Sequence, residues 1–251
     1  MLPTPATAHV NYDHIYEPAE DSYLLLDTLS AKDESTFLAN RFATPSPVPL
    51  IMEVGTGSGI VLAFATANAK QIFGRSDVLS IGADVNALAC VATTKTVQLA
   101  IADSVDNGHV AGLFGSALNA DLTAPLRPQS VDVLIFNPPY VPTEALPPAT
   151  DDAALAKLAE RDRFERDSHL LALSYAGGVD GMETTNRLLD QLPEILSRRG
   201  VAHVLLCKQN RPEAVLKSVR SWPGEWSAEI VGSSGKKAGW EQLCVVRIWR
   251  P

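Results

Sequence analysis

The sequence has little cysteine: its 251 residues contain only Cys90, Cys207 and Cys244, which lie far apart inside apolar segments. It has no C-x-x-C pair and no group of histidines at metal-ligand spacing. Disulfide-stabilised secreted folds and zinc sites both need such spacings. We therefore expect three reduced, buried thiols, no metal ion and an intracellular protein.

Long apolar runs and an excess of basic residues are also missing. No run approaches the roughly 20 apolar residues of a membrane-spanning helix, and residues 1–12 lack the basic start and apolar stretch of a secretory signal. With 21 Lys and Arg against 29 Asp and Glu, the formal net charge is −8. Proteins that bind nucleic acid through its phosphates usually carry a basic stripe. We expect no membrane association, no direct nucleic-acid binding and a cytoplasmic location, with the nucleus as an alternative.

What the chain does have is a regular alternation of strand and helix patterns. Short apolar, β-branched runs predict buried parallel strands, and apolar residues at helical spacing follow them. Strands are expected at Leu50–Val54, Val78–Ala83, His109–Leu118, Val131–Phe136 and Val201–Cys207, and an antiparallel pair at Trp226–Val231 and Leu243–Trp249. Helices are expected at Ile60–Phe73, from the N-cap Asn86 to about Ala102, at Thr184–Leu196 and at Pro212–Val219.

This order predicts an α/β fold with a Rossmann-like, mostly parallel seven-stranded sheet, helices on both faces and a C-terminal antiparallel strand pair. We expect a single domain, in which residues 1–49 form an N-terminal cap and a proline-rich loop and residues 50–251 form the core. Arg199-Gly200 is expected to end a helix before the next strand.

Two segments interrupt the regular plan. Ala43–Pro49 holds three prolines in seven residues and is expected to be a surface loop. Pro142–Asp167 begins with prolines and then interleaves acidic and basic residues. It is interpreted either as a solvated helix with charge pairs one turn apart, or as a lid over the loop that precedes it.

A glycine-rich loop, Glu53-Val54-Gly55-Thr56-Gly57-Ser58-Gly59, joins the first strand to the first helix of the core. Gly55 permits a sharp turn, while Gly57 and Gly59 are expected to let a ligand approach bare backbone. The glycines do not follow the G-x-G-x-x-G spacing of dinucleotide sites. Glu53 would sit poorly beside a pyrophosphate and well beside an ammonium group. The loop therefore favours a cofactor with a cationic amino-acid end, such as S-adenosylmethionine.

Further acidic residues follow the next strands at the same edge of the predicted sheet. Asp84 ends the second strand, where a carboxylate commonly accepts hydrogen bonds from ribose hydroxyls. Asp121 follows the third strand and could accept a hydrogen bond from an adenine amino group, while Leu122 packs on the ring. Ligands of open α/β sheets bind at this edge.

The tetrapeptide Asn137-Pro138-Pro139-Tyr140 closes the fourth strand at the same edge. The carbonyl oxygens of the Asn137 side chain and of Pro138 can accept both hydrogens of an –NH₂ group, which turns the nitrogen lone pair toward a methyl donor. The prolines stiffen the loop and remove N–H donors. Tyr140 offers a flat ring against which an amide or base can lie. Positioning of this kind needs no covalent nucleophile.

With these motifs the chain resembles the class I S-adenosylmethionine-dependent methyltransferases of the HemK type, and within them the eukaryotic release-factor glutamine methyltransferases. The resemblance rests on four stretches that span nearly the whole chain: residues Tyr16–Ser22 with Leu24–Asp27, Glu53–Gly59, Asn137–Thr143 and Ala176–Met182.

The resemblance implies several roles. It implies cofactor contacts from Ser22, Glu53, Gly55, Asp84, Asp121, Leu122 and Asn137, and a substrate glutamine held by Asn137. That glutamine would belong to the Gly-Gly-Gln motif of the class I release factor of translation termination. The resemblance also implies a heterodimer with a small zinc-binding activator, which would cover the third strand near Leu113 and Phe114. The zinc would belong to that partner.

Other functions stay open at this point. An adenine N6-methyltransferase of DNA or RNA would use the same tetrapeptide, but it would need a basic track for the strand. Another protein side chain, such as lysine, is a second alternative acceptor. A nicotinamide-dependent dehydrogenase fits the glycine spacing and Glu53 poorly, and a non-catalytic cofactor-binding scaffold would have no use for the tetrapeptide.

Overall fold

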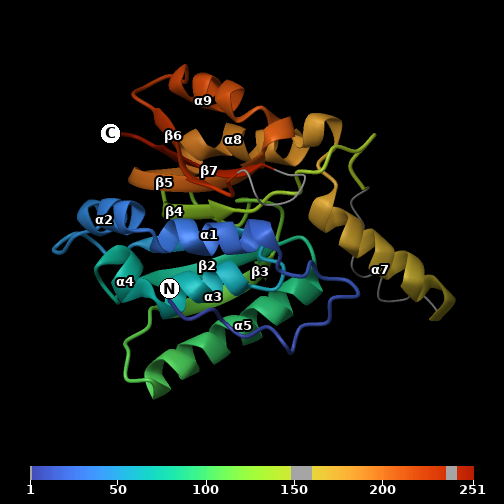
Figure 1. The fold of residues 1–251 in the computed structure, drawn as a ribbon, viewed down its shortest axis with the longest axis horizontal. Helices are drawn as coiled ribbons and strands as arrows, with labels where there is room; N and C mark the ends of the chain where they lie inside the picture. The colour runs from blue at the N-terminus through green and yellow to red at the C-terminus, as the bar shows by residue number, and fades with distance from the viewer. Residues whose placement is uncertain (1, 148–159, 236–241) are drawn as a thin grey trace.

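The computed structural model describes residues 2–147, 160–235 and 242–251, and within them one seven-stranded sheet runs through the molecule (Figure 1). Its strand order is β3-β2-β1-β4-β5-β7-β6. The first five strands pair in parallel, and β7 runs antiparallel to both β5 and β6. This is the predicted Rossmann-like sheet. The strands are β1 (Leu50–Val54), β2 (Leu79–Asp84), β3 (Leu113–Asn119), β4 (Val131–Phe136), β5 (Leu196–Cys207), β6 (Ser227–Ser233) and β7 (Leu243–Trp249).

Helices cover both faces of the sheet, and each face has its own apolar core. One core holds Leu25, Leu29 and Phe73, and the other holds Leu188 and Leu192. On the first face lie α1 (Glu20–Ser30), α2 (Lys32–Arg41), α3 (Ile60–Ala67), α4 (Ala69–Phe73) and α5 (Ala87–Asp106). On the second lie α8 (Glu183–Ile195) and α9 (Pro212–Arg220), while α7 (Glu160–Tyr175) projects to one side (Figure 1).

The strand order reverses at β1, which has β2 on one side and β4 on the other. At such a reversal the connections leave in opposite directions, and a crevice opens at the carboxyl ends of the strands. The glycine loop leaves β1 here and residue Asn137 leaves β4. The topology therefore brings the two motifs singled out in the sequence to the same place.

Three predicted boundaries were wrong, two of them for a local reason and the third because of a neighbouring strand. The helix expected over residues 60–73 breaks at Asn68, whose side-chain amide donates to the Phe64 carbonyl at 3.0 Å. The strand expected from residue 109 begins later, because the His109 amide closes the end of α5 by donating to Ser104. Arg199-Gly200 does not end a helix, since both residues lie within β5.

The early start of β5 has a specific cause in the neighbouring strand. Asp132 of β4 accepts hydrogen bonds from the Ser197 hydroxyl at 2.7 Å and from the Arg199 Nε at 2.9 Å. These bonds hold the segment before Val201 in line with β4. The Asn86 N-cap is confirmed, because its side chain accepts from the Leu88 amide at 3.0 Å.

The segments that interrupt the plan behave differently. Residues 43–49 form the expected loop, which Arg75 holds from inside by donating to the Phe42 and Ser46 carbonyls at 3.1 and 2.9 Å. Of the charged segment over residues 142–167, positions 148–159 lie outside the described residues, so both interpretations of it stay predictions. The N-terminal cap contains two helices, α1 and α2, that the sequence patterns did not predict.

A buried charge cluster ties α2 to the sheet. Glu34 is 2% exposed, and its two carboxylate oxygens lie 2.6 Å from His203 Nε2 of β5 and 2.6 Å from Arg247 Nη1 of β7. The Arg247 guanidinium also lies over the Phe37 ring, 3.6 Å from its centroid. Burial alone would raise the pKa of Glu34, but the His203 hydrogen bond and the charges of His203 and Arg247 hold that pKa below its usual value.

Replacing Glu34 by Gln should lower the free energy of unfolding by about 3–5 kcal/mol, because one partner of a buried charge group is removed. Since the folded-state pKa of Glu34 is lowered, its contribution is present above the usual value of 4.5 and is lost as the pH falls through the folded pKa. Urea unfolding at several pH values measures both effects. The exposed neighbour provides a control: Asp33→Asn should stay within about 0.5 kcal/mol of the parent. Equal stability of the two variants would contradict the assignment.

Candidate active site

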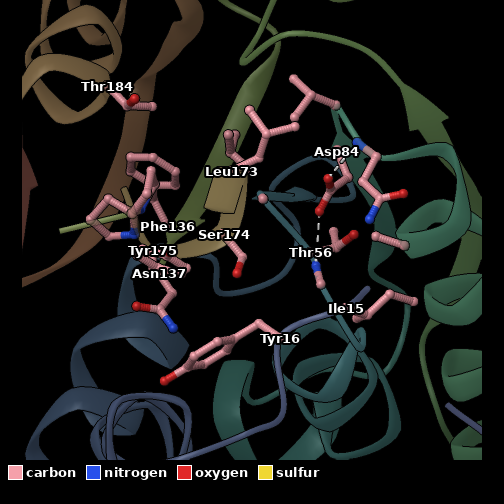
Figure 2. A pocket seen from close by; sticks show the side chains of 18 of the residues that line it. Ile15, Tyr16, Thr56, Asp84, Phe136, Asn137, Leu173, Ser174, Tyr175 and Thr184 are labelled. Atoms are coloured by element: carbon pink, nitrogen blue, oxygen red, sulfur yellow. Dashed lines mark hydrogen bonds between the residues drawn. The ribbon is translucent and has the colours of Figure 1, made fainter. Parts of the chain in front are cut away.

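A cavity of about 920 Å³ opens at the carboxyl ends of the central strands. In Figure 2 the Asn137 and Ser174 side chains lie on one side of it and Asp84 with Thr56 on the other. The site residues expected from the sequence, except Gly59, line this one cavity: Ser22, Glu53, Gly55, Gly57, Asp84, Asp121, Leu122, Asn137, Pro138, Pro139 and Tyr140. The structure thus brings these residues together, whereas their individual roles stay predictions.

The glycine loop is built from left-handed backbone, which favours glycine. Gly55, Gly57 and Gly59 have φ values of +65°, +51° and +78°. A Cβ on Gly57 would meet nothing within 4 Å, so its backbone is open to a ligand. The expectation that Gly59 does the same was wrong. A Cβ there would lie 2.6 Å from the Thr93 Cα, so Gly59 permits close packing of the loop against α5.

Glu53 lies at the end of β1 as a fully buried carboxylate. Its Oε2 accepts a hydrogen bond from the Leu62 amide in the first turn of α3, at 2.8 Å. Burial raises the pKa of Glu53 well above its usual value, the Leu62 hydrogen bond opposes that shift, and the charge of nearby Asp84 raises it further. A cation in the cavity would relieve the cost of ionising this group.

Asp84 joins the glycine loop to the end of β2. Its Oδ2 accepts from the Gly57 amide at 2.9 Å and its Oδ1 from the Asn86 amide at 2.8 Å (Figure 2). Burial raises the pKa of Asp84, and these two hydrogen bonds partly offset the shift. Each oxygen keeps a lone pair for another donor, so the carboxylate is held ready to bind hydroxyl groups.

The region after β3 combines one exposed and one buried residue. Asp121 is about half exposed and forms an ion pair with Arg187 of α8. Leu122 is buried, with a φ of +49°. Arg187 also lines the cavity, and no sequence pattern indicates this, because Arg187 lies 66 residues after Asp121 and on another element.

Asn137 is the polar residue at the end of β4, and its orientation is set by a residue from α1. Its Nδ2 donates to Asp21 Oδ2 at 3.1 Å. A carboxylate only accepts, so the amide nitrogen must face Asp21 and the amide oxygen must face away. Asn137 Oδ1 is buried and has no hydrogen-bond partner among the described residues. A buried acceptor of this kind is a binding group for a donor such as an –NH₂.

Tyr140 occupies the other end of the tetrapeptide. Its ring belongs to the core on the α1 side, and its hydroxyl lies 3.5 Å from the same Asp21 oxygen. Asp21 is 3% exposed. One buried carboxylate therefore contacts both the first and the last residue of the tetrapeptide, and it holds the loop against α1.

Several residues of the cavity were missed in the sequence. Asp21 lay within a quoted stretch but received no role, because nothing in the sequence places α1 beside the end of β4. Tyr16 comes from the N-terminal segment, and α7 and α8 supply four more labelled side chains (Figure 2). These are Leu173, Ser174, Tyr175 and Thr184.

The arrangement fits a cofactor with a cationic amino-acid end and a ribose. Glu53 supplies a buried carboxylate for an ammonium, Gly57 gives open backbone, and Asp84 faces the cavity with spare acceptor capacity. In the described part of the chain there is no group of three or more side chains that could hold a metal ion. No helix described here is long and apolar enough to cross a membrane.

Curated proteins of similar sequence extend over the whole chain. The eRF1 methyltransferase catalytic subunit mtq2 of Schizosaccharomyces pombe is 31% identical over 254 residues, covering 100% of this chain and 96% of the relative. Methyltransferase HEMK2 of Mus musculus is 32% identical over 98% of this chain and 96% of its own length. A putative protein N5-glutamine methyltransferase of Methanocaldococcus jannaschii is 28% identical, over 95% and 93%.

No family model matches the chain. Among solved structures, an rRNA methylase from Streptococcus thermophilus superposes with a TM-score of 0.42 and 12% identity, covering 94% of this chain and 99% of the other. The assignment therefore rests on the full-length sequence relatives, together with the tetrapeptide and the glycine loop in one cavity. The chain belongs to the HemK-type methyltransferases.

Proposed function

We propose that this enzyme methylates the side-chain amide nitrogen of the glutamine in the Gly-Gly-Gln motif of a class I release factor. Two relatives support the proposal by their names: one is an eRF1 methyltransferase catalytic subunit, and the other a putative protein N5-glutamine methyltransferase. The methyl donor is S-adenosylmethionine, which supplies an electrophilic methyl group on a sulfonium. The observation that carries the proposal is the buried, unpartnered Oδ1 of Asn137.

The chain's residues can position such an amide without becoming bonded to it. Asn137 Oδ1 and the Pro138 carbonyl accept its two hydrogens, which directs the nitrogen toward the donor end of the cavity. Asp21 keeps Asn137 from turning its own NH₂ toward the substrate. The acceptor nitrogen would gain the methyl group as the bond from that group to the sulfonium sulfur breaks and the neutral thioether leaves, and the nitrogen would lose one hydrogen as a proton. The rate gain comes from orientation and from exclusion of water.

We also propose that a small zinc-binding activator covers β3. This strand lies at one edge of the sheet, so one row of its backbone groups is free to pair with another chain. Leu113, the first residue of β3, is 65% exposed, and Val110, three residues before it, is 67% exposed. Exposed apolar side chains beside an unpaired sheet edge support a protein interface there. We place the reaction in the cytoplasm, where translation termination occurs.

The proposed acceptor group is tested by Asn137→Ala. Losing one oriented amide contact should cost about 2–4 kcal/mol in the barrier, or roughly 30- to 1000-fold in kcat. Affinity for S-adenosylmethionine should change little, because the glycine loop and the acidic side chains are untouched. Mass spectrometry of the reacted release factor measures the rate and locates the methyl group. A methyl group on lysine, or label transferred only to an oligonucleotide, would refute the substrate.

Glu53→Gln tests the cationic end of the cofactor site. Because a charge-assisted hydrogen bond is worth about 1.5–3 kcal/mol, we expect binding of S-adenosylmethionine to weaken by about tenfold or more near neutral pH. Burial raises the Glu53 pKa, so the parent should bind more weakly as the pH falls and the carboxyl is protonated, while the variant should respond less. Calorimetric titration measures both. Glu20 is exposed, so Glu20→Gln is the matched control. If Glu53→Gln bound S-adenosylmethionine as tightly as Glu20→Gln does, the assigned contact would be contradicted.

The partner surface is tested by Leu113→Asp. Burying a charge in an apolar interface should weaken activator binding by at least about tenfold, without unfolding the isolated chain. Val48 is also exposed and apolar but lies in the loop of residues 43–49, so Val48→Asp is the control. Co-purification and size-exclusion chromatography with the activator distinguish them. Equal retention of both variants would rule out β3 as the interface.

A further inference from the structure

The loop Asn137–Tyr140 has few backbone groups with which it can be held in place. Its two middle residues are prolines, and they carry no N–H group. Besides the side-chain contacts with Asp21, main-chain hydrogen bonds to this part of the chain therefore depend largely on donors that reach its carbonyl oxygens. A buried carbonyl without a donor would cost free energy. The residue that supplies this donor therefore stabilises the conformation of the loop.

Asn210, in the short turn after β5, supplies it. The residue is 3% exposed and lies in η2 (Lys208–Asn210). Its Nδ2 is within 3.3 Å of the Tyr140 carbonyl oxygen, and within 3.1 and 3.3 Å of the carbonyls of Asp180 and Gly181. Its Oδ1 accepts from the Cys207 amide at 2.8 Å. The side chain thus joins β5, the tetrapeptide and a third segment at one point.

That third segment is the glycine-rich stretch over residues 176–182, which the sequence singled out only by resemblance. It pairs with the chain that follows the tetrapeptide. The Gly177 amide donates to the Val141 carbonyl at 2.8 Å, and the Thr143 amide donates to the Gly178 carbonyl at 3.0 Å. The Gly178 amide returns a bond to Thr143 Oγ1 at 3.0 Å. The stretch therefore forms a backing ladder directly behind the acceptor loop.

The glycines of this stretch are needed for space as well as conformation. A Cβ on Gly177 would lie 2.5 Å from the Pro139 carbonyl oxygen. A Cβ on Gly181 would overlap the Tyr140 carbonyl oxygen and lie 2.9 Å from Asn210 Nδ2. Gly181 also has a φ of +68°. Backbone touches backbone here, so movement of the ladder is transmitted to the tetrapeptide.

We infer that Asn210 is a positioning residue for methyl transfer, which acts by holding the Tyr140 carbonyl and the backing ladder so that Asn137 and Pro138 face the acceptor nitrogen. Asn210 is not among the residues that line the cavity, so it acts through the loop and not on the substrate. This inference rests on the acceptor role proposed above for Asn137 and Pro138.

Asn210→Asp is the sharpest test, because the two side chains have the same shape while an acceptor oxygen replaces the donor NH₂. An ionised carboxylate would face three carbonyl oxygens, so we expect kcat to fall by at least about tenfold. The Kd for S-adenosylmethionine should stay within about twofold, since the residue lies behind the acceptor loop and not at the glycine loop. Protonation of the new carboxyl restores one O–H donor, so the ratio of variant to parent kcat should rise as the pH is lowered from about 8 to about 6.

The matched control is Asn68→Asp, another buried asparagine whose Nδ2 donates to a backbone carbonyl, but between α3 and α4. It should lower the melting temperature without a change in kcat that depends on pH. If Asn210→Asp does not fold, Gly181→Ala replaces it, with Gly108→Ala as its control. Gly108 also has a positive φ, of +79°, but a Cβ there meets nothing within 4 Å.

A kcat near the parental value at every pH would overturn the inference, as would equal losses of kcat and cofactor affinity. A lower kcat with intact cofactor binding and recovery at low pH would support it. Failure of the proposed substrate is seen separately, because the parent enzyme would then leave the release factor unmethylated. In that case the ratio of variant to parent kcat is measured at each pH with the acceptor that the parent does methylate.

Discussion

The hydrogen bond from Asn137 Nδ2 to Asp21 decides what the site can recognise. A 180° flip of an asparagine amide exchanges its NH₂ donor and its oxygen acceptor. The surroundings of the side chain decide which of the two faces a ligand. Asp21 selects the acceptor, because a carboxylate can bind only the NH₂ side. Its helix, α1, is packed into the core by Leu25 and Leu29, and the next helix is joined to two strands through Glu34. The N-terminal cap thus sets the chemistry at the end of β4.

The opposite end of the cavity is governed by charge. Glu53 and Asp84 are both buried, and burial raises the pKa of each. The negative charge of Asp84 further raises the pKa of Glu53, so the two are costly to ionise together. A ligand that carries a positive charge offsets that cost, and a neutral one does not. S-adenosylmethionine is cationic at both its ammonium and its sulfonium, and this charge matches the end of the cavity where the acids gather.

The fold and most of the cavity could be predicted because their signals are local. Strand β4 is apolar except for Asp132, the N-cap Asn86 precedes its helix, and the expected site residues other than Ser22 lie at or after strand ends that meet the same edge. Apart from the helix ends at Asn68 and His109, what failed depended on distant partners. Arg199 continues a strand because Asp132 binds it, and Asp21 and Arg187 reach the cavity only once α1 and α8 are packed. The prediction that Gly59 faces the ligand failed because Gly59 packs against Thr93, which lies on another helix.

The two edge strands of the sheet, β6 and β3, are covered to different extents, and this affects the part of the cavity around Asp84. The last strand, β6, packs against α1 and α9, whereas β3 has α5 as its main helical neighbour and exposes Leu113. The end of β3 is also bonded to Asp84: the Ala120 amide donates to the Asp84 carbonyl at 3.0 Å, and Asn119 Nδ2 donates to it at 3.1 Å. Fraying of the exposed edge would therefore loosen the backbone that aims the Asp84 carboxylate. A partner that added pairing to β3 would stabilise the cofactor site without touching the cofactor.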